Sequence, residues 1–159
     1  MLKLIVAASL LAVPAAVMAQ PMTSARYVMK AGASDQYEMQ SSRLVLATTR
    51  NGDLRRFANE MVRDHTKSTA DVKRAALRSR VKAGPPHLDP MGARNVAQLR
   101  RARGPARDAL YIQQQKAAHQ DALRLHGDYA RNGSAPALRM VASGIVPVVQ
   151  HHVDELSRM

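Results

Sequence analysis

The spacing of apolar residues in the first half of the chain is the feature that most restricts its fold. Between residues 54 and 72, small or apolar side chains recur every three or four positions, with one histidine and one serine among them. That spacing places these side chains on one face of an α-helix. Ala, Leu, Arg, Gln and Met dominate the rest of the chain, and runs of β-branched residues are scarce. The sequence therefore predicts an all-α fold.

Turn residues divide the helical pattern into four long helices and one short one. The breaks fall at Asn51-Gly52, at the three prolines within 83–90, at Gly104-Pro105 and at Asn132-Gly133. The long helices are expected over 34–50, 53–81, 106–131 and 136–157, and the short one over 91–103. We expect Ser34 or Asp35 to cap the first long helix, after a short helical turn over 24–30, and Ser134 to cap the last, with a kink at Pro147.

The segment between the second and third long helices, residues 82–104, decides how they are connected. Ten extended residues and a dozen helical ones reach about 50 Å at most, whereas the preceding helix is about 43 Å long. The segment can therefore cross the whole length of the bundle. The sequence predicts a ferritin-like four-helix bundle with a long connector and a short extra helix between helices 2 and 3.

The first 19 residues have the pattern of a cleaved secretory signal peptide. Lys3 precedes an apolar run over 4–17, and the small-residue stretch Val17-Met18-Ala19 follows it. The run is shorter than the roughly 20 residues that a membrane-spanning helix needs. We expect cleavage after Ala19, a single domain over 20–159 and no transmembrane span afterwards. The expected location is the periplasm or the periphery of the outer membrane.

Basic residues outnumber acidic ones and favour a negatively charged neighbour. Lys and Arg total 24 against 12 Asp and Glu. Anionic envelope lipids or other polyanions are candidate partners, and the predicted contact is an arginine cluster around the Gly104-Pro105 break. Its members are Arg94, Arg100, Arg101, Arg103 and Arg107.

Two further observations bear on this charge. A second basic group over 73–82 is expected at the same end of the bundle. Both groups have an alternative interpretation as solvated residues that complement helix dipoles. Specific nucleic-acid binding is not expected, because four tyrosines and one phenylalanine provide few surfaces for base stacking.

Several strings of the sequence resemble a known bacterial family. They include Tyr37-Glu38-Met39-Gln40-Ser41-Ser42-Arg43-Leu44, Phe57-Ala58-Asn59-Glu60-Met61-Val62-Arg63-Asp64-His65-Thr66-Lys67 and Asp108-Ala109-Leu110-Tyr111, followed by Gln115, His119, Pro147 and His152-Val153. In this order they resemble the proteins with domain of unknown function 4142 (DUF4142). The resemblance implies an exported ferritin-like bundle, often labelled an outer-membrane protein, with no established activity.

One ligand-type residue falls in each long helix at a similar predicted height. Glu38 and His65 lie about 13 residues from the first turn, and His119 and His152 lie about 14 and 19 residues from the last. His119 and His152 therefore differ by about 7 Å in predicted height along the bundle, and Gln115, one turn from His119, could close this difference. Three imidazoles and one carboxylate suit zinc, copper or nickel, so Glu38, His65, His119 and His152 form a candidate metal site. The alternative is a buried polar network that holds the helices in register without metal.

Catalytic signatures are not found. Ferritin-type di-iron sites use Glu-x-x-His, whereas Val62, Lys116 and Val149 stand three residues before the candidate histidines. Neither a Gly-x-Ser-x-Gly motif nor a cysteine is present. We therefore predict that the protein is not an enzyme. Asp64 is interpreted as a surface carboxylate, His126 as a core residue, and His87 and His151 as solvent-facing.

Overall fold

The computed structural model describes residues 22–159, which form five helices. They are α1 (Ser24–Leu46), α2 (Gly52–Arg78), α3 (Pro90–Arg101), α4 (Gly104–Asn132) and α5 (Pro136–Ser157). The predicted signal peptide and its cleavage site lie outside the described residues. The all-α prediction is confirmed.

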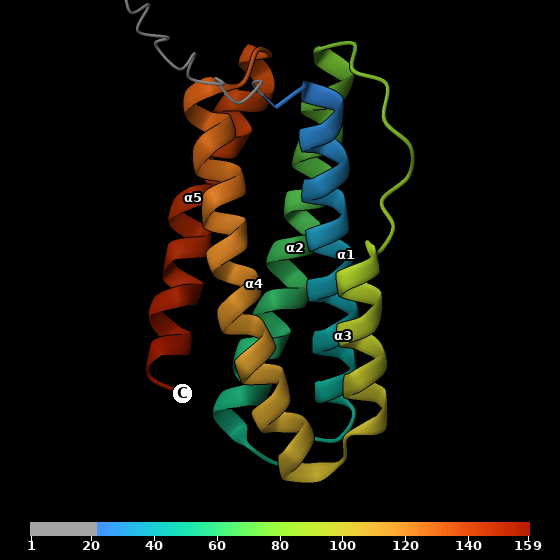
Figure 1. Ribbon diagram of the computed structural model, residues 1–159. Helices are drawn as coiled ribbons and strands as arrows, with labels where there is room; N and C mark the ends of the chain where they lie inside the picture. Colours follow the sequence, from blue (N-terminus) through green and yellow to red (C-terminus); the bar gives the residue numbers. More distant parts are fainter. Residues whose placement is uncertain (1–21) are drawn as a thin grey trace, which may run out of the picture.

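The four long helices form an elongated bundle (Figure 1). α1 packs against α2 and α4 against α5, and the two pairs meet through α1 with α4 and α2 with α5. The short helix α3 lies on the outside of the bundle, mainly against α1. Each long helix therefore has two long neighbours and faces one shared interior.

The chain between α2 and α4 crosses the length of the bundle, as predicted from its length. Figure 1 shows that α2 ends at one end of the molecule and α4 begins at the other. The extended connector passes close to α1, because a Cβ atom added at Gly32 would lie 3.1 Å from Cβ of Pro86. A larger residue at position 32 would push the connector outward.

The start and end of α1 differ from the prediction. The helix begins at Ser24, where the Thr23 hydroxyl accepts a hydrogen bond from the backbone N–H of Arg26. It ends at Leu46, about one turn before the predicted end. Asp35, predicted as a cap, lies inside the helix and is buried. A short polar residue suits a cap and a buried hydrogen bond equally well, so its type alone did not identify its place.

Of the other four helices, α2 and α3 begin with a side-chain cap, whereas α4 and α5 do not. The Asn51 side chain accepts hydrogen bonds from the first backbone N–H groups of α2, and Asp89 does the same for α3. α5 begins after Ala135 without a side-chain cap, so Ser134 does not have its predicted role. Its hydroxyl instead lies 3.1 Å from that of Ser24 at the start of α1.

The interior consists of two apolar clusters with a polar layer between them. One cluster surrounds the stacked rings of Tyr27 and Tyr129, and the other surrounds Phe57 and Tyr111. Along each long helix, the residues of the two clusters flank a stretch of buried polar side chains. This layer contains Asp35, Glu38, His65, Gln115, His119 and His152. Because buried polar groups are costly unless they are paired, the layer is the part of the core that needs a functional explanation.

In the part of the chain that the structure describes, no helix combines the length and the apolar character needed to span a membrane.

Candidate metal centre

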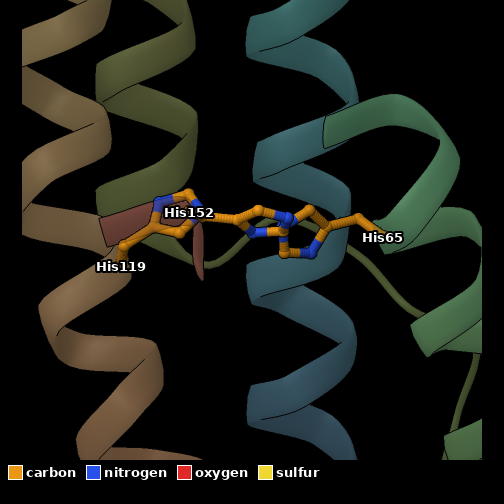
Figure 2. A group of neighbouring side chains, drawn as sticks. All are labelled: His65, His119 and His152. Carbon is orange, nitrogen blue, oxygen red and sulfur yellow. The ribbon is translucent and has the colours of Figure 1, made fainter. Parts of the chain in front are cut away.

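Three histidines from three helices meet in the polar layer (Figure 2). His65 comes from α2, His119 from α4 and His152 from α5, and their side chains are buried. The ring centroids are 5.9 Å apart for His65 and His119, 6.0 Å for His65 and His152, and 5.3 Å for His119 and His152. One nitrogen from each ring lies within 4.8 Å of the others. This spacing lets a single metal ion contact all three rings after small side-chain movements.

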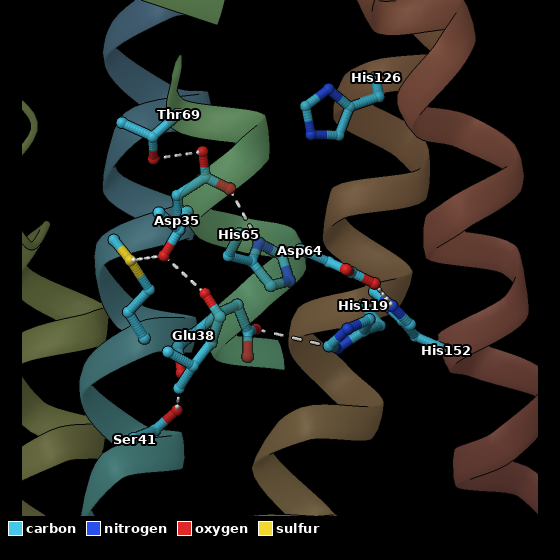
Figure 3. Close-up of polar contacts among 12 residues, drawn as sticks. Asp35, Glu38, Ser41, Asp64, His65, Thr69, His119, His126 and His152 are labelled. Carbon is cyan, nitrogen blue, oxygen red and sulfur yellow. Dashed lines mark hydrogen bonds and ion pairs between the residues drawn. The ribbon is translucent and has the colours of Figure 1, made fainter. Parts of the chain in front are cut away.

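Each ring is oriented by an acceptor on one of its nitrogens (Figure 3). Nδ1 of His65 lies 2.8 Å from Oδ1 of Asp35, whose other oxygen accepts a hydrogen bond from Thr69. Nδ1 of His119 lies 3.0 Å from the backbone carbonyl of Gln115. Nε2 of His152 lies 3.3 Å from Oδ2 of Asp64. Hydrogen bonds of this kind fix the tautomer and the orientation of metal-binding histidines.

The second nitrogen of each ring has no hydrogen-bond partner among the described residues. These atoms are Nε2 of His65, Nε2 of His119 and Nδ1 of His152, and all three are buried. A buried ring nitrogen without a partner is unusual in a folded protein, and three in one cluster are more so. A metal ion that lies between the rings would satisfy all of them by accepting their lone pairs.

Glu38 lies beside the cluster and supplies a carboxylate. Its Oε1 is 3.8 Å from Nδ1 of His119, and its Oε2 has no hydrogen-bond partner among the described residues. Burial raises the pKa of Glu38 to about 7, although nearby His65 and a hydrogen bond from Gln115 oppose this shift. A cation bound in the cluster would favour its charged form.

Burial also sets the charge of the histidines. It lowers the pKa of His119 to about 3 and that of His152 to about 4, and the neighbouring His65 adds to both shifts. For His65, burial is outweighed by the hydrogen bond and charge of Asp35, and its pKa is raised. His119 and His152 are therefore neutral near pH 7, which is the form that binds metal.

A cavity between α2 and α5 leads from the surface to the histidines. Its volume is about 270 Å³, and Asp64, His65, His126 and His152 contribute to its walls. Lys67 and Asp71 stand among the residues that line it. The cavity therefore reaches two of the three clustered histidines, His65 and His152, whereas His119 is not among its lining residues.

The structure brings His65, His119 and His152 together as predicted, but by a different register. His119 and His152 were expected about 7 Å apart in height, with Gln115 closing the difference. Side chains tilt toward the N-terminus of their own helix, and α4 and α5 are antiparallel, so the two rings converge. The Gln115 side chain donates instead toward Ser41.

The contact between α1 and α2 is shifted by about one turn from the prediction. His65 was expected beside Glu38, but its hydrogen-bond partner is Asp35. Because α1 ends at Leu46, residues 47–51 are not helical, and Glu38 lies fewer helical turns from the loop than His65 does. The residue of α1 beside His65 is therefore one turn earlier in the sequence, which is Asp35. Glu38 faces His119 instead.

Asp64 was interpreted as a surface carboxylate, and this was incomplete. Its side chain is 22% exposed and contacts both Arg63 and the buried His152. His126 is a core residue as predicted, with Nδ1 2.9 Å from the hydroxyl of Tyr27. His87 and His151 are exposed. In the sequence, the only hint of a role for Asp64 in the site was its position next to His65. Neighbouring residues on a helix face different directions, so this hint did not identify His152 as its partner.

The predicted arginine cluster divides into two kinds of residue. Arg94, Arg100, Arg101 and Arg103 are exposed, whereas Arg107 is buried and donates hydrogen bonds to the carbonyls of Ala102 and Leu44 and to the hydroxyl of Thr48. Arg107 therefore joins α1 to α4 and is not part of a docking surface.

The expectation that the two basic groups share one end of the bundle was wrong. The group over 73–82 lies where α2 ends, and the turn between α3 and α4 lies at the opposite end (Figure 1). The crossover connector separates them, because it carries the chain along the length of the bundle between the two groups.

Several solved structures share this fold. A DUF305 fragment from Deinococcus radiodurans superimposes with a TM-score of 0.73 at 15% identity, covering 87% of this chain and 96% of that one. CopM in its Cu(I)-bound form gives 0.70 at 16% identity, covering 86% and 94%. CopM in its Cu(II)-bound form gives 0.72 at 14% identity, covering 87% and 96%. At these identities the similarity shows the shared fold.

Sequence comparison identifies the family. No protein of curated function matches this sequence. The family model described as "Domain of unknown function (DUF4142)" matches residues 10–159, nearly the whole chain. The structure adds that this match includes every helix and all three clustered histidines. The chain belongs to the DUF4142 family.

Proposed function

We propose that this protein is an exported, non-enzymatic metal-binding protein that holds one copper ion among His65, His119 and His152. The observation that carries the proposal is the set of three buried ring nitrogens without partners, contributed by three different helices. Imidazole nitrogens bind copper, zinc and nickel, and among divalent ions copper binds most tightly at a given site. Glu38, which lies beside Nδ1 of His119 and outside the three-histidine set, would supply a compensating charge.

The surroundings of the histidines support binding rather than a purely structural role. A buried network that only held the helices in register would be expected to satisfy its own polar atoms. Here the acceptors Asp35, Asp64 and the Gln115 carbonyl occupy the outward nitrogens and leave the inward ones free. Copper is preferred over zinc and nickel because CopM, which shares the fold, is described in Cu(I)-bound and Cu(II)-bound forms. Export is inferred from the signal-peptide pattern at residues 1–19.

Metal titration of the exported chain, purified without an affinity tag, tests the proposal. Cu(I) is titrated under reducing conditions against a chromophoric chelator, and Cu(II) and Zn²⁺ are titrated by calorimetry. We expect one tight Cu(I) ion per chain and a higher melting temperature, because a ligand that binds only the folded state stabilises it. The double variant His65→Ala, His119→Ala should lose both, while His87→Ala, at an exposed histidine, should keep both.

Two results would contradict the proposal. The first is tight copper binding that survives in the double variant with its helix content intact by circular dichroism. The second is no stabilisation by any of the three ions in the wild-type protein, together with a lower melting temperature in the double variant. The second result would favour the polar network that holds the bundle in register.

A second candidate function is docking on an anionic envelope surface through Arg94, Arg100, Arg101 and Arg103. In the described part of the chain, none of these exposed arginines pairs with a carboxylate, whereas Arg56, Arg124 and Arg131 each do. Unpaired guanidinium groups at one end of the bundle are available to lipid phosphates.

Vesicle binding distinguishes this candidate from metal binding. Vesicles of phosphatidylethanolamine with phosphatidylglycerol should bind the wild-type protein at low salt and release it near 0.5 M salt, because screening shortens the range of exposed charges. The variant Arg100→Gln, Arg101→Gln, Arg103→Gln should bind less than the matched control Arg56→Gln, Arg124→Gln, Arg131→Gln. Equal binding by the two variants would show that only net charge matters.

A further inference from the structure

A second group of ligand-type side chains lies on the surface between α2 and α5. Nε2 of His151 is 3.8 Å from Oε1 of Glu60 and 3.9 Å from Oε1 of Glu155. One ligand atom from each of the three lies within 4.8 Å of the others. Glu60 and Glu155 are partly buried, with side chains 23% and 27% exposed, while His151 is 57% exposed. The group is therefore accessible from solvent through His151, while Glu60 and Glu155 are held partly buried against the helices.

The carboxylates of this group lack enough positive charge around them. Oε2 of Glu155 is buried and has no hydrogen-bond partner among the described residues. Arg63 reaches toward both Glu60, at 3.3 Å, and Asp64, at 2.9 Å, but its side chain is 67% exposed. One exposed guanidinium is thus shared by two carboxylates, and Glu155 is paired only with His151 among the described residues. An additional cation at this place would be favourable.

The surface group is connected to the buried histidines. Glu60, Asp64 and His152 form another set whose ligand atoms lie within 4.8 Å of one another. Asp64 in turn holds Nε2 of His152, whose other nitrogen faces the three-histidine cluster. Glu60 therefore belongs both to the surface group and to a chain of ligands that ends at the interior site.

The geometry points to an outer metal site formed by Glu60, His151 and Glu155, which binds a divalent ion such as Zn²⁺ separately from the interior histidines. Two carboxylates and one imidazole give hard oxygen donors and one borderline nitrogen, a set suited to Zn²⁺ with water completing the tetrahedron. The same donors do not favour Cu(I), which prefers softer ligands. Zn²⁺ suits the donors of both sites, so the two sites are distinguished by Cu(I), which is expected only at the interior site.

Zn²⁺ titration by calorimetry tests the outer site independently of the interior one. The double variant His65→Ala, His119→Ala removes interior ligands and should still bind one Zn²⁺ ion. Adding His151→Ala and Glu155→Gln to it should abolish this binding, while adding His87→Ala should not. Retained binding after the first addition, or no binding before it, would overturn the outer site. Cu(I) binding to the wild-type protein tests the interior site, so the two proposals can fail separately.

Arg63 provides a test that a structural role cannot imitate. Its guanidinium competes with a metal ion for Glu60, so Arg63→Gln in the interior double variant should tighten Zn²⁺ binding. An exposed ion pair is worth about 0.2 to 1 kcal/mol, which predicts up to about a fivefold lower dissociation constant. Weaker or unchanged binding would contradict the assignment of Glu60 as a ligand. The helix content of each variant, measured by circular dichroism, confirms that the comparison is between folded proteins.

Because Asp64 connects the two sites, a metal ion bound at the outer site can pass to the interior histidines. This inference rests on the proposed function, which places a metal ion among those histidines. With Zn²⁺ as the probe in the wild-type background, His151→Ala should slow filling of the interior site severalfold in stopped-flow experiments and leave its equilibrium affinity unchanged. Filling at the wild-type rate would overturn the loading role and leave the outer site itself intact.

Discussion

The carboxylate of Asp35 lies 2.8 Å from Nδ1 of His65, and both side chains are buried between α1 and α2. Asp35 is thereby placed behind a candidate metal ligand rather than beside the metal. The contact holds Nε2 of His65 toward the other two histidines, and the negative charge makes the ring a stronger donor.

Replacing Asp35 with asparagine should weaken metal binding without removing a ligand. The amide can still accept the hydrogen bond from His65, but it carries no charge. Loss of such a supporting group typically costs about 10- to 100-fold in metal affinity. Competition titration with a chromophoric chelator measures the change, and Asp121→Asn, at an exposed carboxylate paired with Arg124, is the control. Equal affinities in the two variants would show that Asp35 has no influence on the site.

The metal-free protein should lose stability as the pH falls from about 7 to 5. Burial lowers the pKa of His126 to about 4; the charge of Asp35 opposes this shift and nearby His65 adds to it. In the unfolded chain the same group has a pKa near 6.5, so below that pH the unfolded state takes up a proton that the folded state refuses. The contribution of His126 to the free energy of unfolding is therefore fully present above pH 6.5 and is lost as the pH falls toward 4.

His126 alone should account for about 2 kcal/mol between pH 7 and pH 5. The variant His126→Gln removes this titration and can retain a hydrogen bond to Tyr27. Urea unfolding at the two pH values should show a smaller difference for the variant than for the wild-type protein. The same pH dependence in both would mean that His126 titrates normally in the folded state.

Arg107 should contribute to stability rather than to surface binding. Its buried guanidinium donates to the carbonyl of Leu44 near the end of α1 and to that of Ala102 directly after α3. Arg107→Met keeps the length of the side chain but leaves these acceptors without donors, and hydrogen bonds of charged groups contribute about 1.5 to 3 kcal/mol each. Denaturant unfolding should show a loss of that order. Arg103→Met, at an exposed position, should change stability by no more than about 0.5 kcal/mol.

The fold could be predicted from the sequence because its signals are local. Turn residues such as Asn51 and Gly133 ended the helices within a few positions, and the length of residues 82–104 predicted the crossover. Three of the four candidate ligands, His65, His119 and His152, follow from their positions on inward-facing helical stripes. Periodicity identifies the face of a helix without knowledge of its neighbour.

The supporting residues of the site could not be predicted in the same way. Asp35 and Asp64 act across helix pairs, and their partners depend on register, which changes by a full turn when a loop lengthens by a few residues. Arg107 belongs to an arginine-rich stretch, and its burial depends on how α1 ends against α4. Sequence patterns place a residue on its own helix, whereas these roles are set by the adjacent one.

Gly133 should be essential to the packing between α4 and α5, although its backbone is not unusual. A Cβ atom at this position would lie 2.6 Å from the ring of Tyr129 and equally close to its carbonyl oxygen. That ring stacks on Tyr27 with centroids 3.8 Å apart, and its hydroxyl donates to Ser24, so it cannot move away freely. Gly133→Ala should therefore destabilise the protein by about 1 to 3 kcal/mol through overpacking.

Gly144 is the matched control, because it lies inside α5 with no atom within 4 Å of an added Cβ. Gly144→Ala should be neutral or stabilise the protein by up to about 1 kcal/mol, since alanine is the better helix former. Urea midpoints of the two variants should therefore move in opposite directions. If Gly133→Ala were as stable as the wild-type protein, the stacked tyrosines would have to be mobile, and the apolar cluster around them would not fix the distance between α1 and α4.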